Sequence, residues 1–281
     1  MGAPSVCYVS MLCERDSPEH EVCSLHPDSA DDGRWLHARL AELGIAGELE
    51  LTTLSISNGN ALPDPSQFDA IVIGGTFHGV HDARPWQLPL RQWLLEHRRT
   101  GRPLLGICGG HQAMAVALGA EVSKRPSGTQ VGSVPVAVTP DGAENPLLAG
   151  LGSAPLFHFG NSDEVCLGNF PASATVLAAT ADSPAVAIDY GNGWHSVQFH
   201  PEASHEIFQH WVAIFIEIDE FCIKNDEFCI KNDNFNANFQ VDSGVIGQPA
   251  AGEEFRELVS FALKMRNFVF KLMNFCVKND E

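Results

Sequence analysis

One cysteine and a histidine–glutamate pair are the residues of this sequence best suited to covalent catalysis. Cys108 stands within Gly106-Ile107-Cys108-Gly109-Gly110, between an apolar run and a helix-like stretch over 112–118. This pattern predicts a strand, a sharp turn and a helix, because glycines around a nucleophile permit a strained backbone and close packing. A cysteine at a helix N-terminus is favoured as thiolate by the partial positive charge there.

The second motif is His200-Pro201-Glu202, at the end of an extended run over 196–199. Pro201 disfavours helical backbone at His200, and residues two apart in an extended chain project to the same side. Glu202 can therefore hold one imidazole nitrogen of His200 while the other faces a thiol. Together the two motifs predict a nucleophile, a base and a group that orients the base.

These motifs, G-I-C-G-G-H-Q at 106–112 and Q-F-H-P-E at 198–202, resemble those of the class I (triad) glutamine amidotransferases. The resemblance extends over roughly residues 5–211, and the free-standing members, which resemble amidotransferase domains of GMP synthase type and γ-glutamyl peptidases, are the most similar. It implies Cys108 as nucleophile, His200 as base and Glu202 as the partner of His200.

The resemblance also implies an oxyanion hole and a substrate pocket. The segment 71–76 is similar to the family's oxyanion segment and implies the backbone N–H of Gly75 as a donor beside that of Gly109. The segment 158–165 is similar to a stretch beside the substrate pocket, which implies substrate contacts from Ser162 and Asp163. Gln112 matches the position that helps to hold glutamine.

The sequence departs from the family pattern at two positions. Gly109 follows the cysteine where many relatives carry Phe, Tyr or Leu, and Thr76 stands where many have Pro. Neither departure removes a catalytic group, because both segments contribute backbone N–H. Between the motifs, His78, His81 and Asp82 lie in a loop that either flanks the pocket or is simply solvated.

The order of apolar runs predicts an α/β fold with three layers: a mostly parallel central sheet, helices on both faces, and a small antiparallel sheet. The resemblance implies the flavodoxin-like form of this fold. Expected strands lie at 6–10, 49–54, 68–73, 103–107, 133–138, 155–159, 175–179, 185–188 and 194–199, and expected helices at 35–43, 86–99, 112–118 and 203–211. Short connections among the later strands predict hairpins packed beside the main sheet.

Composition narrows the possible partners. A net charge of −18 argues against binding to nucleic acid or anionic membranes, since there is no basic surplus to neutralise phosphates. No apolar run approaches the length of a membrane span, and no secretory signal is recognisable. Eight scattered cysteines suit reduced thiols, so we expect a protein of the cytosol. His20, Cys23 and His26 form at most half of a metal site, and we expect no metal.

The composition changes abruptly near residue 214. Ten of the seventeen phenylalanines follow that point, and Glu220–Asp226 is repeated at Glu227–Asp233. We therefore expect two parts: an amidotransferase-like domain over 1–213 and a low-complexity, repetitive appendage over 214–281 without a site of its own.

The resulting expectation is hydrolysis of a small-molecule γ-glutamyl amide through a thioester on Cys108, with release of ammonia or an amine and no cofactor. A separate synthase could accept the ammonia. Two alternatives stay open: a γ-glutamyl peptidase acting on glutathione-like substrates, and a catalytically silent binding or regulatory module. The presence of all three triad residues argues against the silent module.

Overall fold

The computed structural model describes residues 3–15, 17, 20, 31–204 and 207–208. Its centre is a sheet in the order β2-β1-β3-β4-β12-β11-β10-β7. The first five strands in this order are parallel: β2 (Glu50–Ser55), β1 (Ser5–Ser10), β3 (Ala70–Ile73), β4 (Leu104–Ile107) and β12 (Trp194–Val197). The other three are antiparallel: β11 (Ala187–Asp189), β10 (Thr175–Ala179) and β7 (Ala137–Val138).

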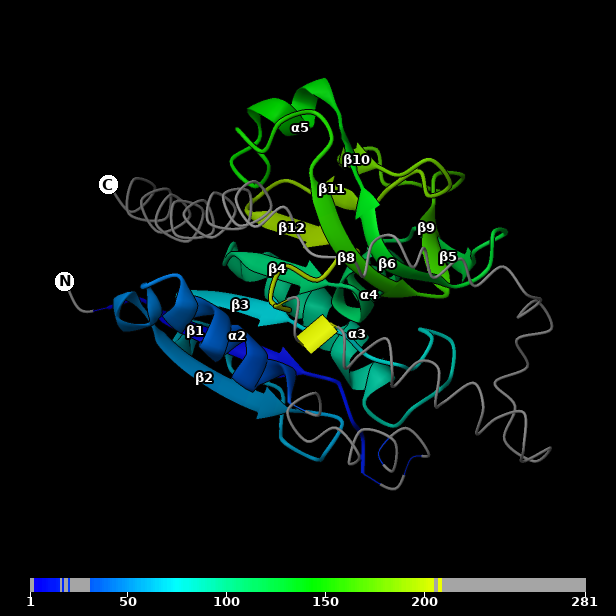
Figure 1. Ribbon diagram of the computed structural model, residues 1–281. Helices are drawn as coiled ribbons and strands as arrows, with labels where there is room; N and C mark the ends of the chain where they lie inside the picture. Colours follow the sequence, from blue (N-terminus) through cyan, green and yellow to red (C-terminus); the bar gives the residue numbers. More distant parts are fainter. Residues whose placement is uncertain (1–2, 16, 18–19, 21–30, 205–206, 209–281) are drawn as a thin grey trace.

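Helices cover both faces of the sheet (Figure 1). Within the continuous described range 31–204, the α-helices are α2 (Asp32–Glu42), α3 (Gln87–His97), α4 (Gly109–Ala117) and α5 (Pro140–Glu144), and short 3₁₀ turns span 46–48, 65–67 and 98–100. The α2 helix begins at Asp32, three residues before the expected start, because the Asp31 carboxylate caps it by accepting the Arg34 backbone N–H at 3.0 Å.

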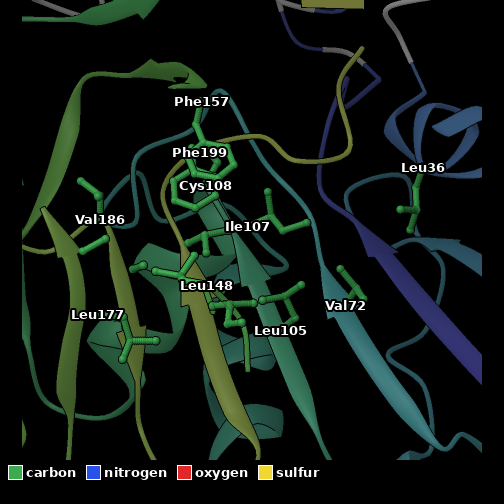
Figure 2. Packing of buried hydrophobic residues seen from close by; sticks show 14 of the residues in the cluster. Leu36, Val72, Leu105, Ile107, Cys108, Leu148, Phe157, Leu177, Val186 and Phe199 are labelled. Atoms are coloured by element: carbon green, nitrogen blue, oxygen red, sulfur yellow. The ribbon is translucent and has the colours of Figure 1, made fainter. Parts of the chain in front are cut away.

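The sheet separates two hydrophobic cores because its strands alternate their side chains. On β1, Val6 and Tyr8 enter the core beneath α2, whereas Cys7 and Val9 enter the core beneath α3 and α4. Figure 2 shows the first of these cores, which reaches Cys108 at the carboxyl end of β4. The expected three-layer α/β fold with a mostly parallel sheet is confirmed.

Two small antiparallel sheets accompany the main one. One pairs β5 (Glu121–Lys124) with β9 (Asp163–Cys166), and the other pairs β6 (Gln130–Pro135) with β8 (Leu156–Asn161). The expectation for the last strands was wrong in one respect: β10, β11 and β12 do not form hairpins beside the main sheet but continue it. Local patterns give strand positions, whereas the choice of partner depends on tertiary packing.

Two expectations fall mainly outside the described residues. Of the closing helix expected over 203–211, Ala203 and Ser204 are not helical, whereas Ile207 and Phe208 are, and the Phe208 N–H donates to the Ser204 carbonyl at 2.9 Å. The low-complexity part over 214–281 lies wholly outside. Within the described ranges, none of the helices is long and apolar enough to cross a membrane.

Candidate active site

Cys108 lies at the turn between β4 and α4, in the conformation that the sequence predicts. Its φ of 49° and ψ of −104° combine a positive φ with a negative ψ, which is a strained conformation for a residue other than glycine. A Cβ atom on Gly106 would lie 2.7 Å from the carbonyl carbon of Gly110, and one on Gly110 would collide with the carbonyl oxygen of Ile73. The two glycines therefore let α4 pack closely against β4 and β3.

His200 and Glu202 follow β12, the strand next to β4. The Nδ1 atom of His200 lies 2.7 Å from Oε1 of Glu202, and both residues are about 2% exposed. The His200 backbone N–H donates to the carbonyl of His158 at 2.9 Å, which fixes the segment against β8. The hydrogen bond expected between this histidine and glutamate is present.

The electrostatics of His200 favour the imidazolium form. Burial alone would lower its pKa, but the Glu202 carboxylate and a charge interaction and hydrogen bond with Cys108 raise the pKa to about 10. A positive His200 between two groups that carry or gain negative charge is the arrangement that keeps a cysteine reactive.

Gly75 completes the neighbourhood from the end of β3. A Cβ atom on Gly75 would lie 3.2 Å from Cε1 of His200 and 3.6 Å from Cβ of Cys108. The Gly110 N–H donates to the Gly74 carbonyl at 3.0 Å. Because a peptide unit is planar, this bond also fixes the direction of the Gly75 N–H, which belongs to the same unit. Adjacent parallel strands thus bring Gly75, Cys108 and His200 to one edge of the sheet.

The two departures from the family pattern lie in contact with each other. A Cβ atom on Gly109 would lie 2.5 Å from Cγ2 and 2.9 Å from the backbone nitrogen of Thr76. The Thr76 hydroxyl in turn accepts the His78 N–H at 3.1 Å, which holds its side chain in this place.

The residues expected at the substrate also lie near one another. Nε2 of Gln112 donates to the carbonyl of Asp163 at 3.2 Å and to Oε1 of Gln198 at 3.1 Å. Gln198 was not among the predicted site residues, although its alternation with His200 in an extended run places both on one side. The carbonyl oxygen of Gly160 lies 3.8 Å from Sγ of Cys108, so the β8 end borders the nucleophile.

Ser162 and Asp163 make contacts of their own within the protein. The Ser162 hydroxyl lies 2.9 Å from that of Thr129, and Oδ1 of Asp163 lies 3.0 Å from Nζ of Lys124. These contacts fix the β8–β9 turn beside Gln112. The structure brings the two residues to the expected region, and their contact with substrate stays a prediction.

The loop after Thr76 is held by a buried carboxylate that the sequence did not single out. Glu14 accepts two hydrogen bonds from Arg84, at 3.0 and 2.7 Å, and one from the Trp86 indole at 3.0 Å, and it lies 3.3 Å from Nε2 of His78. His78 is accordingly buried rather than solvated. His81 contacts the Val122 carbonyl at 3.2 Å.

A pocket of about 590 Å³ lies between this loop, α3 and α4. Thr76 and Gly109 form part of its wall, together with apolar side chains such as Trp86 and Val116. Within the described part of the chain, no group of three or more His, Cys, Asp or Glu side chains is arranged to hold a metal ion; Cys23 and His26 lie outside that part.

A doubly wound α/β sheet with a strained cysteine at its carboxyl edge and a histidine–glutamate pair beside it defines a class of cysteine-centred α/β proteins. Comparison with known families places the chain within this class. The family model for glutamine amidotransferase class-I matches residues 32–217, and the chain belongs to this family.

Individual proteins of this family, or with names that place them in it, are similar to the chain in sequence or in fold. The chain is 33% identical over 158 residues to a subunit of the glutamine-hydrolysing GMP synthase of Ignicoccus hospitalis, covering 54% of this chain and 79% of that protein. It is 32% identical over 190 residues to the glutamine-hydrolysing GMP synthase of Aeropyrum pernix, covering 65% of this chain but 34% of that longer protein. A glutamine amidotransferase structure from Thermotoga maritima is similar in fold, with a TM-score of 0.66 at 15% identity, covering 96% and 99% of the two chains.

Proposed function

We propose that this protein hydrolyses a γ-glutamyl amide through a thioester on Cys108, with His200 and Glu202 completing a catalytic triad. One observation carries the proposal: Cys108, His200 and Glu202 form a continuous buried chain of interactions at the carboxyl edge of the sheet. Gly75 packs directly against the first two. Glutamine hydrolysis is the activity that membership of the family supports.

The first half of the reaction forms the thioester. The Cys108 thiolate attacks the side-chain carbonyl carbon, and the carbonyl oxygen gains negative charge. The N–H groups of Gly75 and Gly109 stabilise that charge, since both belong to backbone segments fixed beforehand. The His200 imidazolium then gives its proton to the departing nitrogen, which leaves as ammonia or an amine.

The second half releases glutamate. Neutral His200 takes a proton from water, and the resulting nucleophile attacks the thioester carbonyl. Cys108 leaves as thiolate when the tetrahedral intermediate collapses, and the imidazolium of His200 is restored. Glu202 holds the ring in the required orientation throughout, because its carboxylate accepts the Nδ1–H.

The side chain of the substrate requires polar contacts deeper in the site. Gln112, Ser162 and Asp163 are the residues that we propose for this task. The side-chain Nε2 of Gln112 donates to the carbonyl of Asp163 and to Oε1 of Gln198. The side-chain oxygen of Gln112 can then accept a hydrogen bond from a bound glutamine. As part of this proposal, the chain acts in the cytosol and passes ammonia to a separate synthase. The Ignicoccus relative supports a separate synthase, since its name makes it one subunit of a GMP synthase.

The test is an assay of the purified chain with glutamine and with glutathione, following ammonia and amine release respectively. Ammonia release from glutamine that is lost in Cys108→Ser supports the proposed activity. Release of cysteinylglycine from glutathione at a higher kcat/KM would instead identify a γ-glutamyl peptidase. No turnover of either substrate, with Cys108 free to react with iodoacetamide, would contradict the proposal and favour a silent binding module.

A further inference from the structure

A buried carboxyl group lies below the oxyanion segment. Asp32 is the first residue of α2 and is 1% exposed. Its Oδ2 accepts a hydrogen bond from the Tyr8 hydroxyl at 2.7 Å, and its Oδ1 accepts one from the Ser10 hydroxyl at 2.6 Å. Both partners are neutral hydroxyl groups. Burial of a carboxyl group with neutral hydroxyl partners is costly in its charged form. Asp31 already caps α2, so capping does not account for Asp32.

The Tyr8–Asp32 pair packs directly against Gly74. A Cβ atom on Gly74 would lie 2.5 Å from Oδ2 of Asp32 and 2.7 Å from Cζ of Tyr8. The Gly74 N–H donates to the Val9 carbonyl at 2.9 Å, and its carbonyl accepts from Gly110. The peptide that carries the Gly75 N–H is therefore held by the first turn of α4, through its carbonyl oxygen, and by packing of the Tyr8–Asp32 pair against Gly74.

The pair also lies within electrostatic reach of the triad. Burial raises the pKa of Asp32 to about 7, the hydroxyls of Ser10 and Tyr8 oppose this rise, and Glu202 and Asp31 add to it. The pKa of Tyr8 is raised by burial and by the charges of Asp32, Glu202 and Cys108. The Glu202 carboxylate is paired with the His200 ring through Oε1, at 2.7 Å, whereas its Oε2 has no hydrogen-bond partner among the described residues.

We propose that Tyr8 and Asp32 are positioning residues for the oxyanion hole, and that Asp32 supports turnover in its neutral form and slows it when ionised. Tyr8 and Asp32 fix the Gly74–Gly75 peptide, and an ionised Asp32 opposes the negative charge that develops on the substrate oxygen. The effect on turnover rests on the proposed function above. The effect of Asp32 on the electrostatic potential at Cys108 does not depend on the proposed function.

The positional part is tested with Tyr8→Phe, which removes only the hydroxyl that touches Gly74. We expect kcat for glutamine to fall about tenfold while KM stays within about twofold, because oxyanion contacts form mainly in the transition state. Tyr190→Phe is the matched control, since Tyr190 is equally buried and lies in the other core. An unchanged kcat in Tyr8→Phe, or a change confined to KM, would overturn this part.

The electrostatic part is tested with Asp32→Asn, which keeps the shape of the side chain and cannot ionise. In the unmodified chain kcat should fall as pH rises through neutrality, and in the variant this fall should disappear. A second measurement compares the alkylation of Cys108 by anionic iodoacetate and neutral iodoacetamide, read by peptide mass spectrometry. At about pH 8, the rate with iodoacetate divided by the rate with iodoacetamide should be about threefold higher in Asp32→Asn than in the unmodified chain. At about pH 6 this ratio should be the same in both proteins.

The two measurements separate the two proposals. Iodoacetate and iodoacetamide ratios need no turnover, so a chain without glutaminase activity contradicts the proposed function and leaves this inference testable. A ratio that Asp32→Asn does not change at either pH would overturn the inference even in an active enzyme. Asp32→Asn also serves if Tyr8→Phe fails to fold.

Discussion

The side chain of Thr76 occupies the space that a side chain on Gly109 would need. The Thr76 methyl group lies 2.5 Å from the position of a Cβ atom on Gly109. The two residues are also the two positions at which this sequence departs from the pattern of many relatives. A Cβ atom on Gly109 would also lie 2.9 Å from the Thr76 backbone nitrogen, so the side chain and the backbone of Thr76 both favour glycine after the nucleophile.

This contact predicts that Gly109→Ala lowers glutaminase activity by displacing Thr76 and, with it, Gly75. Thr76→Ser removes the methyl group but keeps the hydroxyl that accepts the His78 N–H. In the double variant part of the activity should therefore return, with a coupling of about 1 kcal/mol in the transition-state free energy. Purely additive effects in a double-mutant cycle of kcat/KM would contradict the compensation.

The triad predicts unequal effects at its two supporting residues. His200→Ala removes the proton donor and base and should lower kcat more than about a hundredfold. Glu202→Gln keeps an acceptor for Nδ1–H but removes the charge that helps to raise the pKa of His200, so the loss should be smaller. The pH dependence of kcat/KM checks this: Glu202→Gln should move its alkaline limb to lower pH. Equal and mild losses in both variants would argue against the triad.

His97 predicts a loss of stability in mild acid. Burial lowers its pKa to about 4, against a weaker opposing effect of the Pro103 backbone. As pH falls below about 6.5, the unfolded chain binds a proton that the folded chain does not, so the free energy of unfolding decreases until pH reaches the folded-state pKa. For this group the decrease between about pH 7.5 and pH 5 is about 2 kcal/mol.

His97→Phe should abolish that part of the acid sensitivity. Phenylalanine keeps the stack on Trp93 and Trp194, whose ring centroids lie 4.9 and 5.5 Å from that of His97. Thermal melts at both pH values measure the effect, with His37→Phe as a control at an exposed position of α2. If His97→Phe loses as much stability in acid as the unmodified chain, another group controls the transition.

The domain boundary predicts that a chain ending after Phe215 is soluble and active. All proposed catalytic groups precede that point, and the repeats of 214–281 lack a complete apolar face. Ammonia release and a thermal melt of residues 1–215 beside the full chain measure this. A melting temperature lower by several degrees, or aggregation, would show that the repeats complete the core, since about 1 kcal/mol shifts the melting temperature of a domain of this size by roughly 2–4 °C.

The sequence was sufficient to predict the parts of the site that local backbone geometry determines. The glycines around Cys108 indicate a strained turn from β4 to α4, and the proline after His200 indicates an extended segment that lets Glu202 reach the same ring. Both patterns span only a few residues. The parallel β-helix-β order then places the ends of β3 and β4 at one edge, which accounts for the position of Gly75.

The rest depends on contacts between distant segments. Asp32 has the sequence pattern of an acidic residue in the first turn of a helix, and only its packing on Tyr8 and Gly74 shows that it lies beneath the site. Glu14 lies in a polar stretch of the sequence, and only its contacts with the distant residues Arg84, Trp86 and His78 show its role. The pairing of β12 with β4 likewise depends on which apolar faces pack together, because the sequence of a short strand does not specify its partner strand.

The central claim, a covalent intermediate on Cys108, is tested most directly by acid quenching during turnover of glutamine, followed by mass spectrometry of the Cys108 peptide. We predict one glutamyl group attached to Cys108 in the unmodified chain. In Cys108→Ser, a nearly isosteric variant, we predict no adduct, unaltered folding and ammonia release reduced more than about a hundredfold. Ammonia release that persists in the folded variant, or turnover without a glutamyl adduct on Cys108, would contradict the mechanism.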